Sequence, residues 1–210
     1  MKLKKSFMKK MIDTIFFPIR ALFIPENSHL GLTSLRDERM ELVASEASGY
    51  VLDIGCGKNN IFIKNYVKNG VGVDVFEYEG VDNVVKDITN LPFKSETFDT
   101  VTLIAVGGHI PKELREKEFK EISRVLKPGG KLIMTEGEPI TQTICHIYRE
   151  YSYKMIGKVD MDHERGMEHD EEYCMPYSEI ITYLNSYGLK LVKRKRFMWG
   201  LNNMYVAKKV

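Results

Sequence analysis

The sequence has few cysteines, little net charge and no long uninterrupted apolar run. The cysteines are Cys56, Cys145 and Cys174, an odd number without any CxxC spacing, which argues against a disulfide framework or a zinc ribbon. Free thiols are typical of a reducing, cytoplasmic location. A net charge of +2 among 210 residues is far from the strongly basic balance of nucleic-acid-binding proteins.

Residues 1–24 also lack the features of a signal peptide and of a membrane span. Pro18 and Arg20 interrupt the apolar stretch, no A-x-A site follows, and the stretch is too short and too charged to cross a bilayer. Its apolar residues recur at helical spacing among five lysines in the first ten residues, which predicts a basic amphipathic helix ending near Pro18. Such a helix can lie in a membrane interface or cap the protein's own core, and the sequence leaves both open.

Strands and helices alternate after residue 50. Apolar runs predict strands at 50–54, 71–75, 83–85, 98–106 and 131–135, and later at 189–197 and 204–208. Helices are predicted at 35–47, 112–125 and 178–186. This alternation predicts an α/β fold with parallel strands joined by helical crossovers. We divide the chain into residues 1–34, the N-terminal helix and linker, and a main domain of residues 35–210, with an acceptor-side insertion at 139–176 after the fifth strand.

The most specific signal is a glycine-rich turn after the first of these strands. The segment from Val51 to Gly57 reads VLDIGCG, in which Asp53 is followed by Gly55 and Gly57. Glycines let the backbone bend sharply and approach a ligand closely, and open α/β sheets bind ligands at the carboxyl ends of their strands. Asp74 follows 21 residues after Asp53 (74 − 53), at the end of the next strand, where a carboxylate can accept both hydroxyls of a ribose.

A third carboxylate, Asp87, ends the short strand that follows, just before Ile88. It is placed to accept from an adenine amino group, with Ile88 or Phe76 against the ring.

Together these motifs resemble the class I methyltransferases that depend on S-adenosylmethionine (SAM), above all the small-molecule set that includes the ubiquinone and menaquinone biosynthesis enzymes. The resemblance is carried, over roughly residues 50–137, by Val51 to Gly57, Gly72-Val73-Asp74, Asp87-Ile88 with Leu91-Pro92-Phe93, Phe98-Asp99, and Leu126 to Gly130. It implies a Rossmann-like three-layer sandwich with a seven-stranded, mostly parallel sheet whose last strand is antiparallel.

The resemblance also implies SAM as the cofactor. It assigns Asp53 and Gly55 to the methionine part, Asp74 to the ribose and Asp87 to the adenine. The full set predicted to contact the cofactor is Asp53, Gly55, Cys56, Gly57, Asn59, Asp74, Val75, Phe76, Asp87, Ile88 and Ala105.

One departure from the family pattern is Asn59, which stands where a third glycine is common. Asparagine tolerates unusual backbone angles, so we expect the turn to form and Asn59 to be available to the ligand. A dinucleotide dehydrogenase would have its third glycine at position 60, which is Asn60 here. The missing glycine argues against NAD.

The candidates on the acceptor side are His109, His163 and Arg165. His109 follows the strand predicted at 98–106, beside the expected methyl group, where it can act as a base, orient the substrate or shape its own loop. His163 and Arg165 lie in the insertion, where Arg165 can clamp a carboxylate or phosphate, although such a charged run also suits a solvated loop. No third ligand with metal-site spacing accompanies the histidines, so no metal is predicted.

Two hypotheses follow. The first is a SAM-dependent methyltransferase acting on a small-molecule or lipid-like acceptor, with a peripheral membrane contact through residues 1–24. The second is a non-catalytic SAM- or nucleoside-binding protein of the same fold, because a fold does not fix a function. A nucleic-acid partner is not expected, since the basic run Lys193 to Arg196 alternates across a strand and has no accompanying stacking motif.

Overall fold

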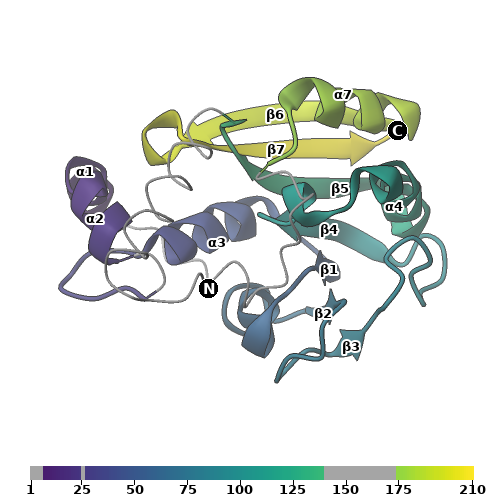
Figure 1. Cartoon of the computed structure of the whole chain (residues 1–210), viewed down its shortest axis with the longest axis horizontal. Coiled ribbons are helices and arrows are strands. Elements are labelled where there is room, and N and C mark those ends of the chain that lie inside the picture. The colour runs from purple at the N-terminus through teal and green to yellow at the C-terminus, as the bar shows by residue number, and fades with distance from the viewer. Residues whose placement is uncertain (1–6, 25–26, 140–173) are drawn as a thin grey trace.

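The computed structural model describes residues 7–24, 27–139 and 174–210, and its centre is a seven-stranded sheet (Figure 1). The strand order is β3-β2-β1-β4-β5-β7-β6. The strands are β1 (Val51–Ile54), β2 (Gly70–Asp74), β3 (Asn83–Val84), β4 (Phe98–Ile104), β5 (Leu126–Gly137), β6 (Leu189–Phe197) and β7 (Asn202–Lys209). Strand β7 runs antiparallel to β5 and β6, and the other pairs are parallel. The predicted fold class is confirmed.

Helices cover both faces of the sheet. On one face, α4 (Lys112–Val125) and α7 (Tyr177–Ser186) pack on a core that includes Leu52, Leu132 and Met134. On the other, α3 (Leu35–Glu46) and a π-helical segment, η2 (Phe62–Val67), pack on a core that includes Val51 and Ile133. Strand residues alternate between the two cores because successive side chains point to opposite faces, which produces the three-layer sandwich.

Most predicted elements form, and the differences have local causes. Helix α4 and strand β6 have the predicted bounds, whereas β5 begins five residues earlier, at Leu126, because Leu126 already pairs with Phe98 of β4. The short helical segments η1 (Lys58–Asn60) and η2 were not predicted. Most of the insertion predicted at 139–176 lies outside the described residues.

The N-terminal stretch forms two helices, α1 (Phe7–Ile15) and α2 (Phe17–Phe23). The first helix ends at Ile15, near Pro18 as predicted, but a second helix that was not predicted follows, and Pro18 occupies its first turn. Proline is well suited to that position, since its missing N–H has no partner in a first turn and its fixed φ is helical.

The two helices are held by a buried polar network. Arg20 is 1% exposed, donates from Nε to the Thr33 carbonyl oxygen at 2.6 Å and from a terminal nitrogen to the Asp13 carbonyl oxygen at 2.6 Å, and pairs with Glu38 of α3. The Asp13 carboxylate accepts from the Thr33 amide at 3.0 Å and from its hydroxyl at 2.7 Å. This network joins α1 and α2 to the start of α3.

The same helices leave an apolar stripe exposed. It consists of Phe7, Met8, Met11, Ile15, Phe16, Ile19 and Phe23, and Phe7 and Phe23 are 84% and 71% exposed. The buried side instead carries Asp13, Phe17, Arg20 and Ile24. Two of these four are charged, so the helices turn much of their polar side toward the protein.

Contacts at residue 199 place α1 and α2 beside the sheet. Trp199 lies in η4 (Met198–Gly200), the turn from β6 to β7, and its indole N–H donates to the Thr14 carbonyl oxygen at 2.9 Å. The rings of Phe17 and Trp199 are 5.2 Å apart. The N-terminal helices therefore lie near the carboxyl ends of β5 and β6 (Figure 1).

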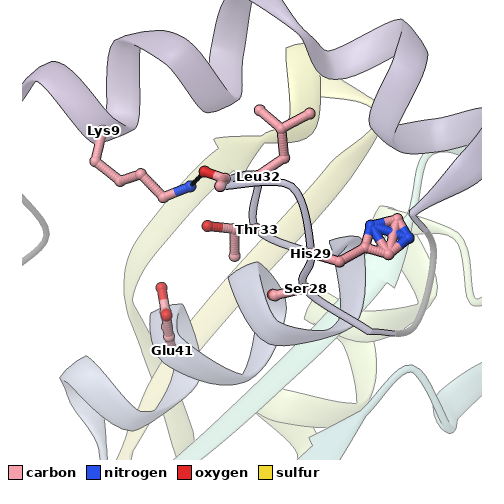
Figure 2. A pocket seen from close by; sticks show the side chains of 7 residues that line it. Lys9, Ser28, His29, Leu32, Thr33 and Glu41 are labelled. Carbon is pink, nitrogen blue, oxygen red and sulfur yellow. Dashed lines mark hydrogen bonds between the residues drawn. The ribbon is translucent and has the colours of Figure 1, made fainter.

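A pocket of about 330 Å³ opens between α1, the loop at 28–33 and α3 (Figure 2). Its lining includes Lys9, His29 and Glu41, and none of the predicted site residues that the structure describes lines it. Lys9 at its rim is already bound to Asp13 and to the Gly31 carbonyl oxygen. The predicted residues Asp53 and Asp74 lie instead toward the carboxyl ends of β1 and β2.

Candidate cofactor site

The glycine-rich turn leaves β1 at the carboxyl edge, between β2 and β4. Gly55 has φ 72° and Gly57 has φ 63° with ψ −173°, conformations that side chains disfavour. A Cβ on Gly55 would come within 2.5 Å of the Val106 side chain, so glycine lets the segment after β4 pack on the turn. A Cβ on Gly57 would meet nothing within 4 Å, so this turn faces open space.

Asp74, at the end of β2, holds the turn in place. One carboxylate oxygen accepts the Gly57 amide at 2.9 Å, and the other accepts the Phe76 amide at 3.1 Å. A carboxylate has about four acceptor positions. These two bonds therefore fix its orientation and leave capacity for a ligand, as the ribose assignment requires.

Asp53 is a buried acid that forms no ion pair with a described residue. Its carboxylate accepts the Thr102 hydroxyl at 2.6 Å. Burial, and after it the charge of Asp74, raise the pKa of Asp53 to about 7, although the Thr102 hydrogen bond acts in the opposite direction. Burial, followed by the charges of Asp53, Asp74 and Asp82, also raises the pKa of the Cys56 thiol. No described residue forms an ion pair with Asp53 or Asp74, and a cationic ligand beside them would favour the ionised form of Asp53.

Two asparagines complete the turn. Asn59 has φ 66°, as expected for an asparagine in the place of a glycine, and its backbone N–H donates to the Glu79 carbonyl oxygen at 2.6 Å. Asn60 is fully buried and donates to the Asp82 carboxylate at 2.6 Å. A Cβ at Gly72 would come within 2.4 Å of the Asn60 side chain, which explains why a glycine precedes Asp74 by two residues.

Asp87 lies further from its strand than predicted. Strand β3 ends at Val84, and Asp87 follows in a turn where it accepts the Thr89 amide at 2.9 Å and the Thr89 hydroxyl at 2.6 Å. These hydrogen bonds lower its pKa, so the exposed carboxylate is ionised. Val75 and Ile88 are half-buried and Phe76 is 42% exposed, so an aromatic face is available close to Asp74.

The acceptor side begins where β4 ends. Ala105 has φ 57°, and its amide donates to the backbone and side-chain oxygens of Thr135, both at 3.1 Å. His109 ends a short 3-10 helix, η3 (Gly107–His109), and is exposed. His163 and Arg165 lie outside the described residues. In the part of the chain that the structure describes, no group of three or more acidic, histidine or cysteine side chains could hold a metal ion.

Sequence reasoning missed two buried acids, Glu136 and Glu118. Glu136 follows Thr135 at the end of β5, and Glu118 lies on α4 with both carboxylate oxygens unpartnered. Burial raises the pKa of Glu136 to about 7 and that of Glu118 to about 8. Period-two alternation, which puts Glu136 on the same face as Leu132 and Met134, is a signal that could have identified it.

Comparison with known proteins adds the family. The methyltransferase domain family matches residues 52–134, from the glycine-rich turn to β5. Residues 52–134 of this chain therefore form a methyltransferase domain of the class I, SAM-dependent type. Its fold agrees with that assignment, since the PH0226 protein from Pyrococcus horikoshii OT3 superposes with a TM-score of 0.60 at 22% identity, over 83% of this chain and 90% of that one.

Two curated methyltransferases show how far the sequence similarity extends. A demethylmenaquinone methyltransferase from Bacillus cytotoxicus is 26% identical over 83% of this chain and 84% of its own length. A probable tRNA methyltransferase 9B from Homo sapiens is 34% identical over 46% of this chain and 23% of its own length. The chain thus spans less than a quarter of that human relative.

The residues present fit SAM, the cofactor of this methyltransferase family. SAM carries a sulfonium and an ammonium group, and Asp53 and Asp74 supply negative charge without a described cation to balance it. The open space at Gly57 admits a ligand against the backbone. When bound, SAM supplies an electrophilic methyl group, and the protein's task is to align the acceptor and exclude water.

Proposed function

We propose that this chain transfers the methyl group of SAM to a small-molecule acceptor of the quinone type. The observation that carries the proposal is the pair of acidic side chains, Asp53 and Asp74, which no described cation pairs with and which lie around an open glycine-rich turn. The acceptor class rests on the similarity to the demethylmenaquinone methyltransferase, which extends over most of both chains.

The proposal gives each site residue a role. Asp74 accepts the ribose hydroxyls, Asp53 faces the positive end of the methionine part, and Asp87 accepts the adenine amino group beside Phe76 and Ile88. The segments around the turn and after β4 line the cofactor, with contacts from Gly55, Cys56, Gly57, Asn59, Val75 and Ala105. On the acceptor side we assign His109, together with His163 and Arg165 of the insertion.

Calorimetry tests the cofactor half of the proposal. We expect the purified protein to bind SAM and its demethylated product, S-adenosylhomocysteine, and to bind NAD far more weakly. A preference for NAD would contradict the proposal. The reduced form of a demethylmenaquinone analogue with a short side chain then tests turnover, which is measured as release of S-adenosylhomocysteine. Tight SAM binding without turnover of any quinol would favour the non-catalytic alternative.

We further propose that the enzyme works at an anionic membrane surface on the cytoplasmic side. The apolar stripe of α1 and α2 is exposed, and the exposed Lys10 lies on the same helix as its first half. Amphipathic helices of this kind bind membranes through apolar area and through attraction of lysines to anionic lipids. Because Trp199 ties α1 to the turn at the carboxyl edge, the stripe lies near the acceptor side. None of the described helices is long and apolar enough to cross a membrane.

Sedimentation with liposomes tests this part. The wild-type protein should co-sediment with anionic vesicles at low salt and dissociate as salt rises. The double variant Phe7→Ser, Phe23→Ser should lose binding while leaving the Arg20 network intact. Val192→Ser is the matched control, since Val192 is an exposed apolar residue, at 56%, on strand β6. Equal co-sedimentation of the double variant and the wild type would remove the membrane from the proposal.

A further inference from the structure

Glu136 is a buried acidic side chain near the carboxyl end of β5. It is 3% exposed, and its Oε2 accepts the Met175 amide at 3.3 Å. Its Oε1 is buried and has no well-formed hydrogen bond to a described residue, although the Gly107 backbone N–H lies close enough to favour the ionised form. A buried acceptor without a partner costs free energy, so such groups persist where they have a use.

The surroundings place this oxygen on the acceptor side. Thr135, the preceding residue, receives the Ala105 amide, so the ends of β4 and β5 are joined there. A Cβ on Gly107 would come within 2.3 Å of Oε1. Any larger residue at position 107, in the segment between Ala105 and His109, would therefore clash with the Glu136 carboxylate.

The titratable side chains closest to Glu136 belong to three other elements, α3, α4 and β7. Arg39 of α3 and Arg115 of α4 both favour its ionised form, and Tyr205 of β7 lies within range of its charge. Arg39 and Arg115 already donate elsewhere, Arg39 to Asn202 at 3.1 Å and Arg115 to Glu179 at 3.0 Å. Neither arginine forms an ion pair with Glu136, so Oε1 keeps an acceptor position in addition to the one that faces the Gly107 backbone N–H.

We propose that Glu136 Oε1 accepts the proton of a hydroxyl-bearing acceptor, such as a hydroquinone or phenol, as the methyl group is transferred. The electron pair that the O–H bond releases becomes available to the acceptor's nucleophilic atom, which forms the new bond to the methyl carbon. The bond from sulfur to that carbon breaks with its pair on sulfur, and the proton ends on the carboxylate, which becomes a neutral acid. This inference rests on the proposed function and deepens it by naming the acceptor's functional group.

Burial gives the carboxylate a suitable proton affinity. The pKa of Glu136 is raised to about 7, so near neutral pH it can accept a proton and release it again. Glu118 provides a matched control, since it is also fully buried with a raised pKa of about 8. It lies on α4, where the charge of Arg115 favours its ionised form and neither of its carboxylate oxygens bonds a described residue.

The test measures proton exchange when 2-naphthol binds to the protein saturated with S-adenosylhomocysteine. This phenol stays neutral between about pH 6 and pH 8 because phenols lose their proton near pH 10. Calorimetry in buffers of different ionisation enthalpy should show proton release on binding, because a hydroxyl that donates to Oε1 favours the ionised form of Glu136. The release should decrease as the pH rises above the pKa of Glu136, since less of the carboxyl is then protonated before binding.

Variants separate the outcomes. Glu136→Gln should bind S-adenosylhomocysteine normally, release no proton and bind 2-naphthol about tenfold more weakly at about pH 8. Glu118→Gln should behave as the wild type. If Glu136→Gln fails to fold, Glu136→Asp keeps the carboxylate and should keep the proton release. A wild-type complex that binds 2-naphthol without proton release, or does not bind it, overturns the inference. Loss of S-adenosylhomocysteine binding by the wild type would instead refute the proposed function.

Discussion

Replacing Asp74 tests the ribose assignment directly. The carboxylate orients the turn through the amides of Gly57 and Phe76, and the proposal adds two charge-assisted bonds to the ribose hydroxyls. Each such bond contributes about 1–2 kcal/mol. Asp74→Ala should therefore weaken binding of S-adenosylhomocysteine by about 2–4 kcal/mol, or roughly 30- to 1,000-fold in Kd.

A comparison of two nucleosides separates the lost ribose bonds from a displaced turn. The wild-type protein should bind adenosine more tightly than 2′,3′-dideoxyadenosine, and Asp74→Ala should bind the two equally. Asp82→Asn is a control for the turn, because Asp82 also holds backbone at this edge, accepting the Gly72 amide at 2.8 Å. That variant should keep the preference for adenosine. Titration calorimetry gives all six affinities, and an adenosine preference that survives in Asp74→Ala would refute the assignment.

Three further predictions concern the turn, the N-terminal helices and pH. Gly57→Ala should weaken SAM binding, measured by calorimetry, because alanine is strained at φ 63° and its Cβ enters the open space at the turn. Gly31→Ala is the control, since Gly31 has φ 73° and an equally open Cβ position but lies outside the turn, and it should leave binding unchanged. Arg20→Met should lower the free energy of unfolding, measured in urea, by about 3–5 kcal/mol, because it leaves Glu38 and buried carbonyl oxygens without their hydrogen-bond donor. It should not alter SAM affinity. The raised pKa of Glu118 should make the free energy of unfolding of the wild type fall as the pH rises from about 4 to about 8, because the folded state holds this proton more tightly than the unfolded state does. Glu118→Gln should reduce that fall by about 2–5 kcal/mol, measured by urea unfolding at several pH values.

The cofactor half of the site could be predicted because its signals are local. Asp53, Gly55 and Gly57 lie within one turn, and Asp74 ends the next strand, so strand periodicity and glycine spacing suffice to bring them together. Asn59 was correctly expected to tolerate a positive φ. The position of Asp87 was less accurate, because the two-residue strand β3 ends early and a local turn with Thr89 decides where this carboxylate lies.

The N-terminal stretch shows how amphipathic spacing can mislead. Apolar residues at helical spacing predicted a single apolar side that either packs on the core or meets a membrane. In the structure, Phe17 and Ile24 share the buried side with Asp13 and Arg20, while most of the apolar side chains point outward. The sequence does carry this second pattern, since positions 13, 17, 20 and 24 follow helical spacing too. Pairing Arg20 with Asp13 and Glu38 depends on the loop to α3, which local periodicity does not describe.

The acceptor half was harder to predict because it is assembled from distant parts of the chain. Gly107 and Glu136 meet only because β4 and β5 are parallel neighbours in register, and Met175 joins them after the insertion. The match to the methyltransferase domain family ends at residue 134, two residues before Glu136 (136 − 134). Family motifs thus describe the segment that binds the shared cofactor. The residues that distinguish one acceptor from another lie where those motifs stop, which is why a test of Glu136 reports on the acceptor independently of SAM binding.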